Sequence, residues 1–164
     1  MQFRLTDHFN PADKTINLSE SVYNQRSVAA AAVAAHETGH ALQHATNYAP
    51  LRLRSSLVPL VQFSSTFSQI VIILGIMLIE IFPFLFWIGI MMCAMVLIFS
   101  LVTLPVEYNA SSRALAWLST SGGLSSMEVD QAKEALMWAA RTYVVSALSA
   151  LATLLYYLGF ARNR

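Results

Sequence analysis

The sequence predicts a mainly α-helical integral membrane protein: a helical bundle with about three transmembrane helices, a further helix that carries an H-E-x-x-H motif, and a small N-terminal β-hairpin. Three observations support this prediction. Hydrophobic residues make up 56% of the 164-residue chain and charged residues only 12%, about half the charged share of an average soluble domain. Three long apolar runs follow the motif, and the N-terminal residues alternate polar and apolar side chains. The length suits a single domain over residues 1–164.

The N-terminal residues 1–26 predict the β-hairpin. Phe3 and Leu5 can lie on one side of a first strand, and residues 10–13 (Asn-Pro-Ala-Asp) have the composition of a turn. Residues 15–18 then alternate polar and apolar side chains, as a half-buried strand does. We therefore expect two short strands ahead of the first helix.

Residues 27–47 predict the helix that carries the motif. The segment is rich in alanine, the best helix former, and Ser27 can cap its first turn. Its many small side chains allow neighbouring helices to approach closely, as in membrane bundles. Residues 48–50 (Tyr-Ala-Pro) should end this helix.

Three apolar runs, residues 60–82, 84–104 and 142–160, predict transmembrane helices. A bilayer core of about 30 Å requires about 20 apolar residues in a helix, and the run over 84–104 contains no charged residue. The early turns of the first run are rich in serine and glutamine, so they should face protein or water. A buried helix of a soluble protein would explain one such run, but hardly three in so short a chain. A turn at residues 80–83 joins the first two runs into a hairpin.

Residues 105–141 predict two amphipathic helices between the second and third runs. Pro105 suits the first position of a helix that extends to about Ser119. Residues 122–123 (Gly-Gly) should break this helix. The Ser-x-x-Glu sequence at residues 125–128 has the pattern of a capping box and should open the next one.

Charge and cysteine content limit the function classes. The net charge is +1, whereas nucleic-acid-binding proteins show strongly basic patches, so nucleic acid is not an expected partner. The single cysteine, Cys93, has no intrachain disulfide partner. The expected surroundings are a lipid bilayer. No charge lies in the middle of an apolar run, which argues against a metal transporter.

The most specific chemical signal is the sequence His36-Glu37-Thr38-Gly39-His40. On a helix, residues 36 and 40 lie one turn apart on the same face, so both imidazoles can bind one metal ion. Glu37 is offset by about 100° and can take a proton from water without binding the metal. This is the H-E-x-x-H pattern of zinc hydrolases, carried by a zincin-type helix. The alternative is a polar helix face whose histidines are satisfied by hydrogen bonds.

A third ligand should come from another segment, because catalytic zinc sites keep three protein ligands and one open position. A histidine ten residues after the first is absent, since residue 46 is threonine. His44 continues the helix face, but three consecutive turns of one straight helix cannot surround one ion. Glu80 lies at the far end of a membrane run, whereas Glu107 is the first acid met after two runs return the chain to its starting side. Glu107 is therefore preferred to the acids of the predicted solvated helix, Glu128, Asp130 and Glu134.

Four segments carry a family resemblance: HETGHALQ (36–43), PVEYNASSRALAWL (105–118), LTDHFNP (5–11) and INLSE (16–20). On these segments the chain resembles the YugP-like membrane zinc metallopeptidases over nearly its whole length. More distantly, it is similar to HtpX-like and CAAX-prenyl-protease-like membrane peptidases. Those peptidases are gluzincins, in which a glutamate on a later helix completes the site.

The resemblance implies a zinc-dependent metalloendopeptidase that hydrolyses peptide bonds with a zinc-activated water. It implies His36, His40 and Glu107 as zinc ligands and Glu37 as the catalytic acid and base. The sequence departs from its relatives at two points. The distant relatives have an aspartate four positions after the ligand glutamate, where this chain has Ser111. YugP-like proteins usually begin with another membrane span, which the N-terminal residues here do not contain.

The oxyanion formed during peptide hydrolysis needs a hydrogen-bond donor besides zinc. The candidates are Tyr108, His8 and Arg113. Alternatively, Tyr108 only packs against its neighbours, His8 belongs to a turn, and Arg113 is a charge at the membrane surface. Asn109 is a candidate to orient a metal ligand. The distant resemblance also implies that the strand around residues 3–8 offers an edge to an extended substrate.

Positive charges beside the apolar runs predict the orientation in the membrane. Five of them lie on the side of the motif, none lies at the turn near Glu80, and Arg162 and Arg164 follow the last run. The positive-inside rule therefore places the zinc site in the cytoplasm of a multi-pass cell-membrane protein. The five residues are Arg52, Arg54, Arg113, Lys133 and Arg141.

Two functions are compatible with these features. The first is a membrane-embedded zinc peptidase that acts on peptides or membrane proteins near the membrane surface. The alternative is a non-catalytic membrane protein with a structural or vestigial zinc site. Glu37 argues against the alternative, because a purely structural site needs no base.

Overall fold

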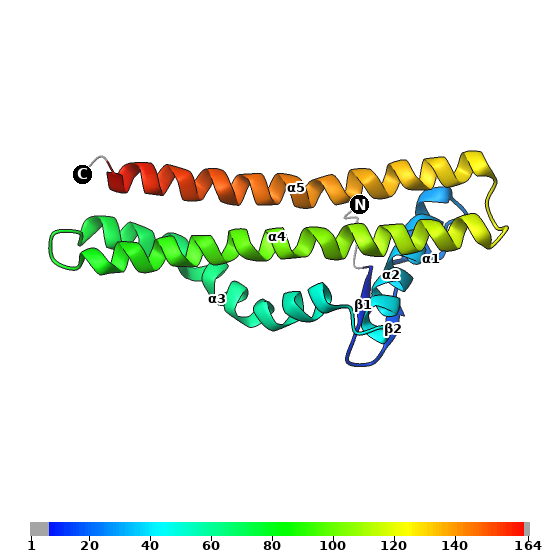
Figure 1. The fold of residues 1–164 in the computed structure, drawn as a ribbon, viewed down its shortest axis with the longest axis horizontal. Helices are drawn as coiled ribbons and strands as arrows, with labels where there is room; N and C mark the ends of the chain where they lie inside the picture. The colour runs from blue at the N-terminus through cyan, green and yellow to red at the C-terminus, as the bar shows by residue number, and fades with distance from the viewer. Residues whose placement is uncertain (1–6, 163–164) are drawn as a thin grey trace. The chain divides into compact units, whose positions relative to one another are not determined.

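The computed structural model describes residues 7–162 and is mainly α-helical, as predicted (Figure 1). A short antiparallel hairpin precedes five helices, of which the last three are long enough to cross a membrane. Phe3 and Leu5, assigned above to the first strand, lie outside the described residues. The elements are β1 (His8–Asn10), β2 (Thr15–Asn17), α1 (Glu20–Tyr23), α2 (Val28–Ala45), α3 (Ala49–Met77), α4 (Pro83–Thr120) and α5 (Ser126–Arg162).

The chain divides into two compact units that share the long helices. The first unit comprises Met1–Leu51 and Pro105–Thr142, and the second comprises Arg52–Leu104 and Tyr143–Arg164. The H-E-x-x-H motif and Glu107 both belong to the first unit. The candidate site can therefore be described within this unit alone.

In the first unit, β1 and β2 pair in antiparallel register, with Phe9 opposite Ile16. The turn uses Asn10, whose side-chain oxygen accepts a hydrogen bond from the Ala12 N–H at 2.9 Å. Both strands contact α2. The prediction of a half-buried second strand is wrong: all three residues of β2 are exposed. Two strands of three residues are too short to bury a complete face.

Helix α2 begins as its sequence predicts, because the Ser27 hydroxyl accepts a hydrogen bond from the Ala30 N–H at 3.2 Å. Small residues then let the helix approach α4 very closely. A Cβ atom added at Gly39 would lie 2.5 Å from the Ala110 carbonyl oxygen. The same helix face contributes alanines to a core cluster that comprises Ala32, Ala35, Ala114, Leu118, Ala132 and Leu136.

Two predicted helix boundaries are wrong. Pro105 does not start a helix but lies inside α4, which runs unbroken from Pro83 to Thr120. The expected amphipathic helix and the span over 142–160 likewise form one helix, α5. Proline costs one backbone hydrogen bond, and long helices at a membrane tolerate this loss when neighbouring groups satisfy the freed carbonyl. No glycine or proline interrupts residues 126–158.

The break between α4 and α5 lies where the sequence predicts it. Gly122 has a φ of +70°, a conformation that side chains disfavour, just after α4 ends. The capping box opens α5, since the Ser125 N–H and hydroxyl donate to the Glu128 carboxylate at 2.8 and 2.7 Å.

In the second unit, close glycine contacts hold α3 and α4 together. A Cβ atom added at Gly75 would lie 2.5 Å from Phe86 Cα, and one added at Gly89 would lie 2.4 Å from Ile72 Cγ1. Ile72 and Phe86 form the centre of the local core. Small residues at such contacts are typical of membrane helices.

The most apolar windows of α3, α4 and α5 have mean hydropathies of 1.7, 2.6 and 1.8, and at most 28% of each window is buried by protein. Apolar surface left open over three such helices is the surface that a lipid bilayer covers. The composition and length of these helices thus fit the predicted transmembrane helices.

The contact at Gly39 gives a first test. We expect Gly39→Ala to lower the free energy of unfolding of the detergent-solubilised protein by about 1–3 kcal/mol, because the added methyl group must push α2 away from α4. Thermal unfolding followed by circular dichroism measures this change. Gly123→Ala is the control, since a Cβ atom there meets nothing closer than the Ser121 hydroxyl oxygen at 3.6 Å. Equal stability of the two variants would contradict the close approach of the helices.

Candidate metal centre

Two helices bring three potential metal ligands together. His36 and His40 lie one turn apart on α2, and Glu107 lies on α4. The Glu107 Oε2 atom is 3.2 Å from His36 Nε2 and 3.6 Å from His40 Nε2. One potential ligand atom from each of the three residues lies within 4.8 Å of the other two. Glu80 belongs to the second unit and is not part of this group.

The spacing of these atoms fits zinc. Zinc binds imidazole nitrogen and carboxylate oxygen at about 2.0–2.2 Å in a tetrahedron, which places ligand atoms about 3.3 Å apart. The two nitrogen-to-oxygen distances are close to this value. The three side chains are also shielded from water, with exposed fractions of 16% for His36, 13% for His40 and 4% for Glu107.

The electrostatics of the group favour a cation. Burial lowers the pKa of His40, but its polar neighbours together outweigh burial and raise the pKa above its usual value, with the hydrogen bond and negative charge of Glu107 contributing most. The hydrogen bond with Gln43 and the negative charge of Glu37 add to this increase. The site is therefore a buried position where positive charge is stabilised.

The outer nitrogen of each imidazole has its own oxygen partner. Ser111 Oγ lies 3.1 Å from His36 Nδ1, and Gln43 Oε1 lies 3.0 Å from His40 Nδ1. These partners leave both Nε2 atoms directed at Glu107. Ser111 of α4 thus contacts the potential ligand His36 of α2.

Glu37 is buried beside the ligands, with 8% of its surface exposed. Its Oε2 atom accepts a hydrogen bond from the Phe9 backbone N–H at 3.0 Å. This N–H is directed away from β2, so the outer edge of β1 faces Glu37. Its neighbour Thr38 is exposed, and its hydroxyl donates to the Ala34 carbonyl oxygen.

The other predicted site residues differ in their surroundings. Tyr108 is 49% exposed, and its hydroxyl makes no hydrogen bond to any residue between 7 and 162. His8 lies on β1, with Nε2 3.5 Å from the Asn17 amide nitrogen. The His44 ring contacts the Phe9 ring, with centroids 5.6 Å apart. His44 therefore stays outside the ligand group, as expected for a third turn of one helix.

Arg113 and Asn109 form a pair behind the ligands. The Arg113 Nε–H donates to Asn109 Oδ1 at 2.8 Å, and the same oxygen accepts a hydrogen bond from the Gln43 amide at 3.0 Å. Asn109 therefore reaches His40 only through Gln43. Gln43 was not among the predicted site residues, although its position three residues after His40 places it on the same helix face.

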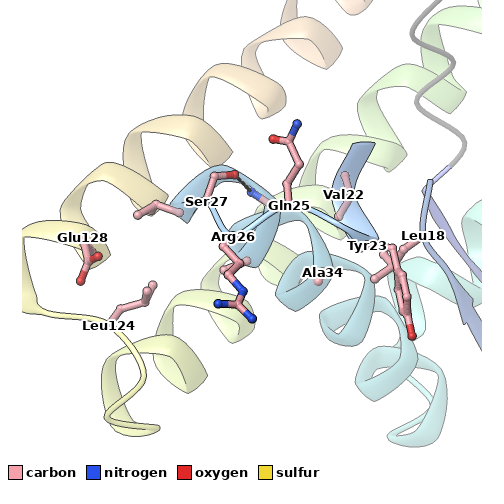
Figure 2. Close-up of a pocket in the computed structure, with 12 residues that line it drawn as sticks. Leu18, Val22, Tyr23, Gln25, Arg26, Ser27, Ala34, Leu124 and Glu128 are labelled. Atoms are coloured by element: carbon pink, nitrogen blue, oxygen red, sulfur yellow. Dashed lines mark hydrogen bonds between the residues drawn. The ribbon is translucent and has the colours of Figure 1, made fainter. Parts of the chain in front are cut away.

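A pocket of about 420 Å³ lies along the N-terminal half of α2 (Figure 2). Alanine side chains of α2 leave this space open, and the last of them, Ala34, precedes Glu37 by one helical turn. The Arg26 guanidinium and the Glu128 carboxylate both line the pocket, whereas the three potential ligands do not. The remaining lining residues are Leu18, Val22, Tyr23, Gln25, Ser27, Val28, Ala30, Ala31 and Leu124.

The helical fold and the His-His-Glu group, in which Glu107 is buried and both histidines are partly buried, indicate a membrane protein with a candidate zinc centre. Comparison with known families identifies the chain further. Residues 1–162 match the family described as "Putative neutral zinc metallopeptidase". The chain belongs to this family, and zinc is the cofactor that the family and the ligand group indicate.

A curated relative supports the same assignment. The chain is 40% identical to the "Putative membrane protease YugP" of Bacillus subtilis (strain 168) over 154 aligned residues. The aligned region covers 94% of this chain and 68% of the relative. No solved structure matches the chain significantly. The resemblance predicted from the four sequence segments is confirmed.

The ligand group gives a second test. We expect His36→Ala and Glu107→Ala each to lower zinc affinity by more than about 100-fold, which exceeds the loss from removing a mere hydrogen-bond partner of a ligand. Metal content after dialysis against a weak chelator measures the effect. Glu134→Ala, which removes an exposed acid of α5, should keep one zinc ion per chain. Full zinc content in the Glu107 variant would exclude this carboxylate as a ligand.

Proposed function

We propose that the protein is a membrane-embedded zinc endopeptidase of the gluzincin type, with His36, His40 and Glu107 as ligands and Glu37 as general base. The observation that carries this proposal is the convergence of the three potential ligands, with the buried Glu37 next to His36 on the same helix. The family supports peptide hydrolysis as the reaction.

The proposed chemistry divides between the metal and Glu37. When bound, zinc supplies a Lewis acid that polarises the scissile carbonyl group and makes water more acidic. Glu37 takes a proton from the attacking water at one carboxylate oxygen and later gives it to the leaving amine. Its burial suits this role, because a carboxylate shielded from bulk water exchanges its proton with the substrate rather than with solvent.

The substrate is proposed to be a peptide or a membrane protein that binds in an extended form. Support comes from β1, which pairs with β2 on one side and has its other edge beside Glu37, where the Phe9 N–H already donates to the Glu37 carboxylate. An extended chain could pair with this edge through backbone hydrogen bonds. Tyr108, His8 and Arg113 remain the proposed oxyanion donors; the Arg113 Nε–H is bonded to Asn109, so Arg113 would donate from its terminal nitrogens.

The alternative, a structural zinc site without catalysis, has less support. The family and the curated relative are both described as peptidases or proteases. A structural zinc site also usually has four protein ligands, whereas the metal-binding group found among residues 7–162 has three members.

The role of Glu37 gives a third test. We expect Glu37→Gln to keep zinc bound while hydrolysis of a casein-type substrate falls by about 10²–10⁴-fold, because the amide cannot accept the proton. Zinc content and proteolysis are measured on the same detergent-purified sample. Unchanged hydrolysis by a pure variant would rule out Glu37 as the base.

We further propose that the zinc site faces the cytoplasm, as the distribution of positive charges indicates. Single cysteines at His44 and Ile81, introduced into a Cys93→Ser background, test this orientation, since both positions are exposed to solvent or lipid. A membrane-impermeant maleimide should label residue 81 in intact cells and residue 44 only after permeabilisation. The reverse labelling pattern would contradict the proposal.

A further inference from the structure

Gln43 is a fully buried polar residue whose side-chain amide nitrogen and oxygen both form hydrogen bonds. Its exposed fraction is 0%. The amide nitrogen donates to the Val106 carbonyl oxygen at 2.8 Å and to Asn109 Oδ1 at 3.0 Å. The amide oxygen lies 3.0 Å from His40 Nδ1. A buried amide satisfied on both sides is a strong geometric constraint on its neighbours.

Arg113 fixes the direction of each hydrogen bond in this network. A guanidinium group can only donate hydrogen bonds, so the oxygen of Asn109 must face Arg113. The same oxygen lies against Gln43, which must therefore present its NH₂ group there. The Val106 carbonyl oxygen requires the same orientation. The amide oxygen of Gln43 is then left to face His40, which must carry its proton on Nδ1.

This proton position has a consequence for the metal centre. A neutral imidazole that is protonated on Nδ1 has its free lone pair on Nε2. Nε2 is the atom that lies beside Glu107. In addition, Gln43 holds the carbonyl group of Val106, the residue immediately before Glu107, so the same amide ties α2 to α4 next to the third ligand.

We propose that Arg113, Asn109 and Gln43 form a relay that sets the tautomer of His40, with Gln43 as the positioning residue for zinc binding. This inference rests on the proposed function only in taking His40 as a zinc ligand. It also gives Arg113 a role different from that of an oxyanion donor. The relay does not touch the substrate.

The test compares zinc affinities, measured by chelator competition on the detergent-purified protein. Gln43→Met keeps the size of the side chain but removes all three hydrogen bonds, and should weaken zinc binding by about 10–100-fold. Asn109→Leu, which removes one of the two acceptors that fix the Gln43 amide, should weaken zinc binding in the same direction but by less. Asn109→Asp should restore affinity to within about threefold of the wild type, because its carboxylate accepts the same two hydrogen bonds.

Two controls separate positioning from folding and from catalysis. Gln131→Met, at an exposed position of α5, should leave zinc affinity unchanged. The affinities are measured in a Glu37→Gln background, so hydrolysis does not enter the result.

Wild-type affinity in both Gln43→Met and Asn109→Leu would overturn the relay while leaving the zinc site intact. If the protein with an intact relay fails to bind zinc at all, the proposed function fails instead. If Gln43→Met does not fold, the Asn109→Leu and Asn109→Asp pair decides the question.

Discussion

The structure of the first unit depends on one buried carboxylate between two imidazoles. Glu107 is 3% exposed, and a carboxylate so far from water is stable only when positive charge or strong donors surround it. His36 and His40 lie 3.2 and 3.6 Å from its Oε2 atom and can supply that charge when protonated. A divalent ion placed among the three groups satisfies the same requirement more completely. The contacts between the two imidazoles and Glu107 thus join α2 to α4 and form the candidate metal centre.

The packing of α2 on α4 explains why the three groups can meet. The glycine of the H-E-x-x-H motif allows the helices to approach until a Cβ atom at Gly39 would touch the Ala110 carbonyl oxygen. Side chains on both sides of this contact then point into the narrow gap: Ser111 and Gln43 each reach an imidazole from behind. A wider separation would leave the Ser111–His36 hydrogen bond too long and the potential ligand atoms too far apart for one ion. Packing, ligand orientation and metal binding thus share a single geometric cause.

Much of the site could be predicted from the sequence, because its strongest constraints are local or topological. The motif predicts two potential ligands through the helical repeat, and the order of apolar runs and acids along the chain predicts Glu107 as the third, which the structure places beside them. The helix boundary at Pro105 was predicted wrongly, because a proline preference for the first turn cannot compete with a continuous helix stabilised by its surroundings. The role of Gln43 was missed for a different reason. Its partners, Val106 and Asn109, lie more than sixty residues away, and no periodic pattern indicates which polar side chain of α2 will meet them.

The central claim is that two imidazoles and one carboxylate hold a single zinc ion. X-ray absorption at the zinc edge of the purified protein measures the ligands directly. One zinc per chain is expected, bound only by nitrogen and oxygen at about 2.0–2.2 Å, with scattering from two imidazole rings. A sulfur neighbour from Cys93, or scattering from a single imidazole, would contradict the account.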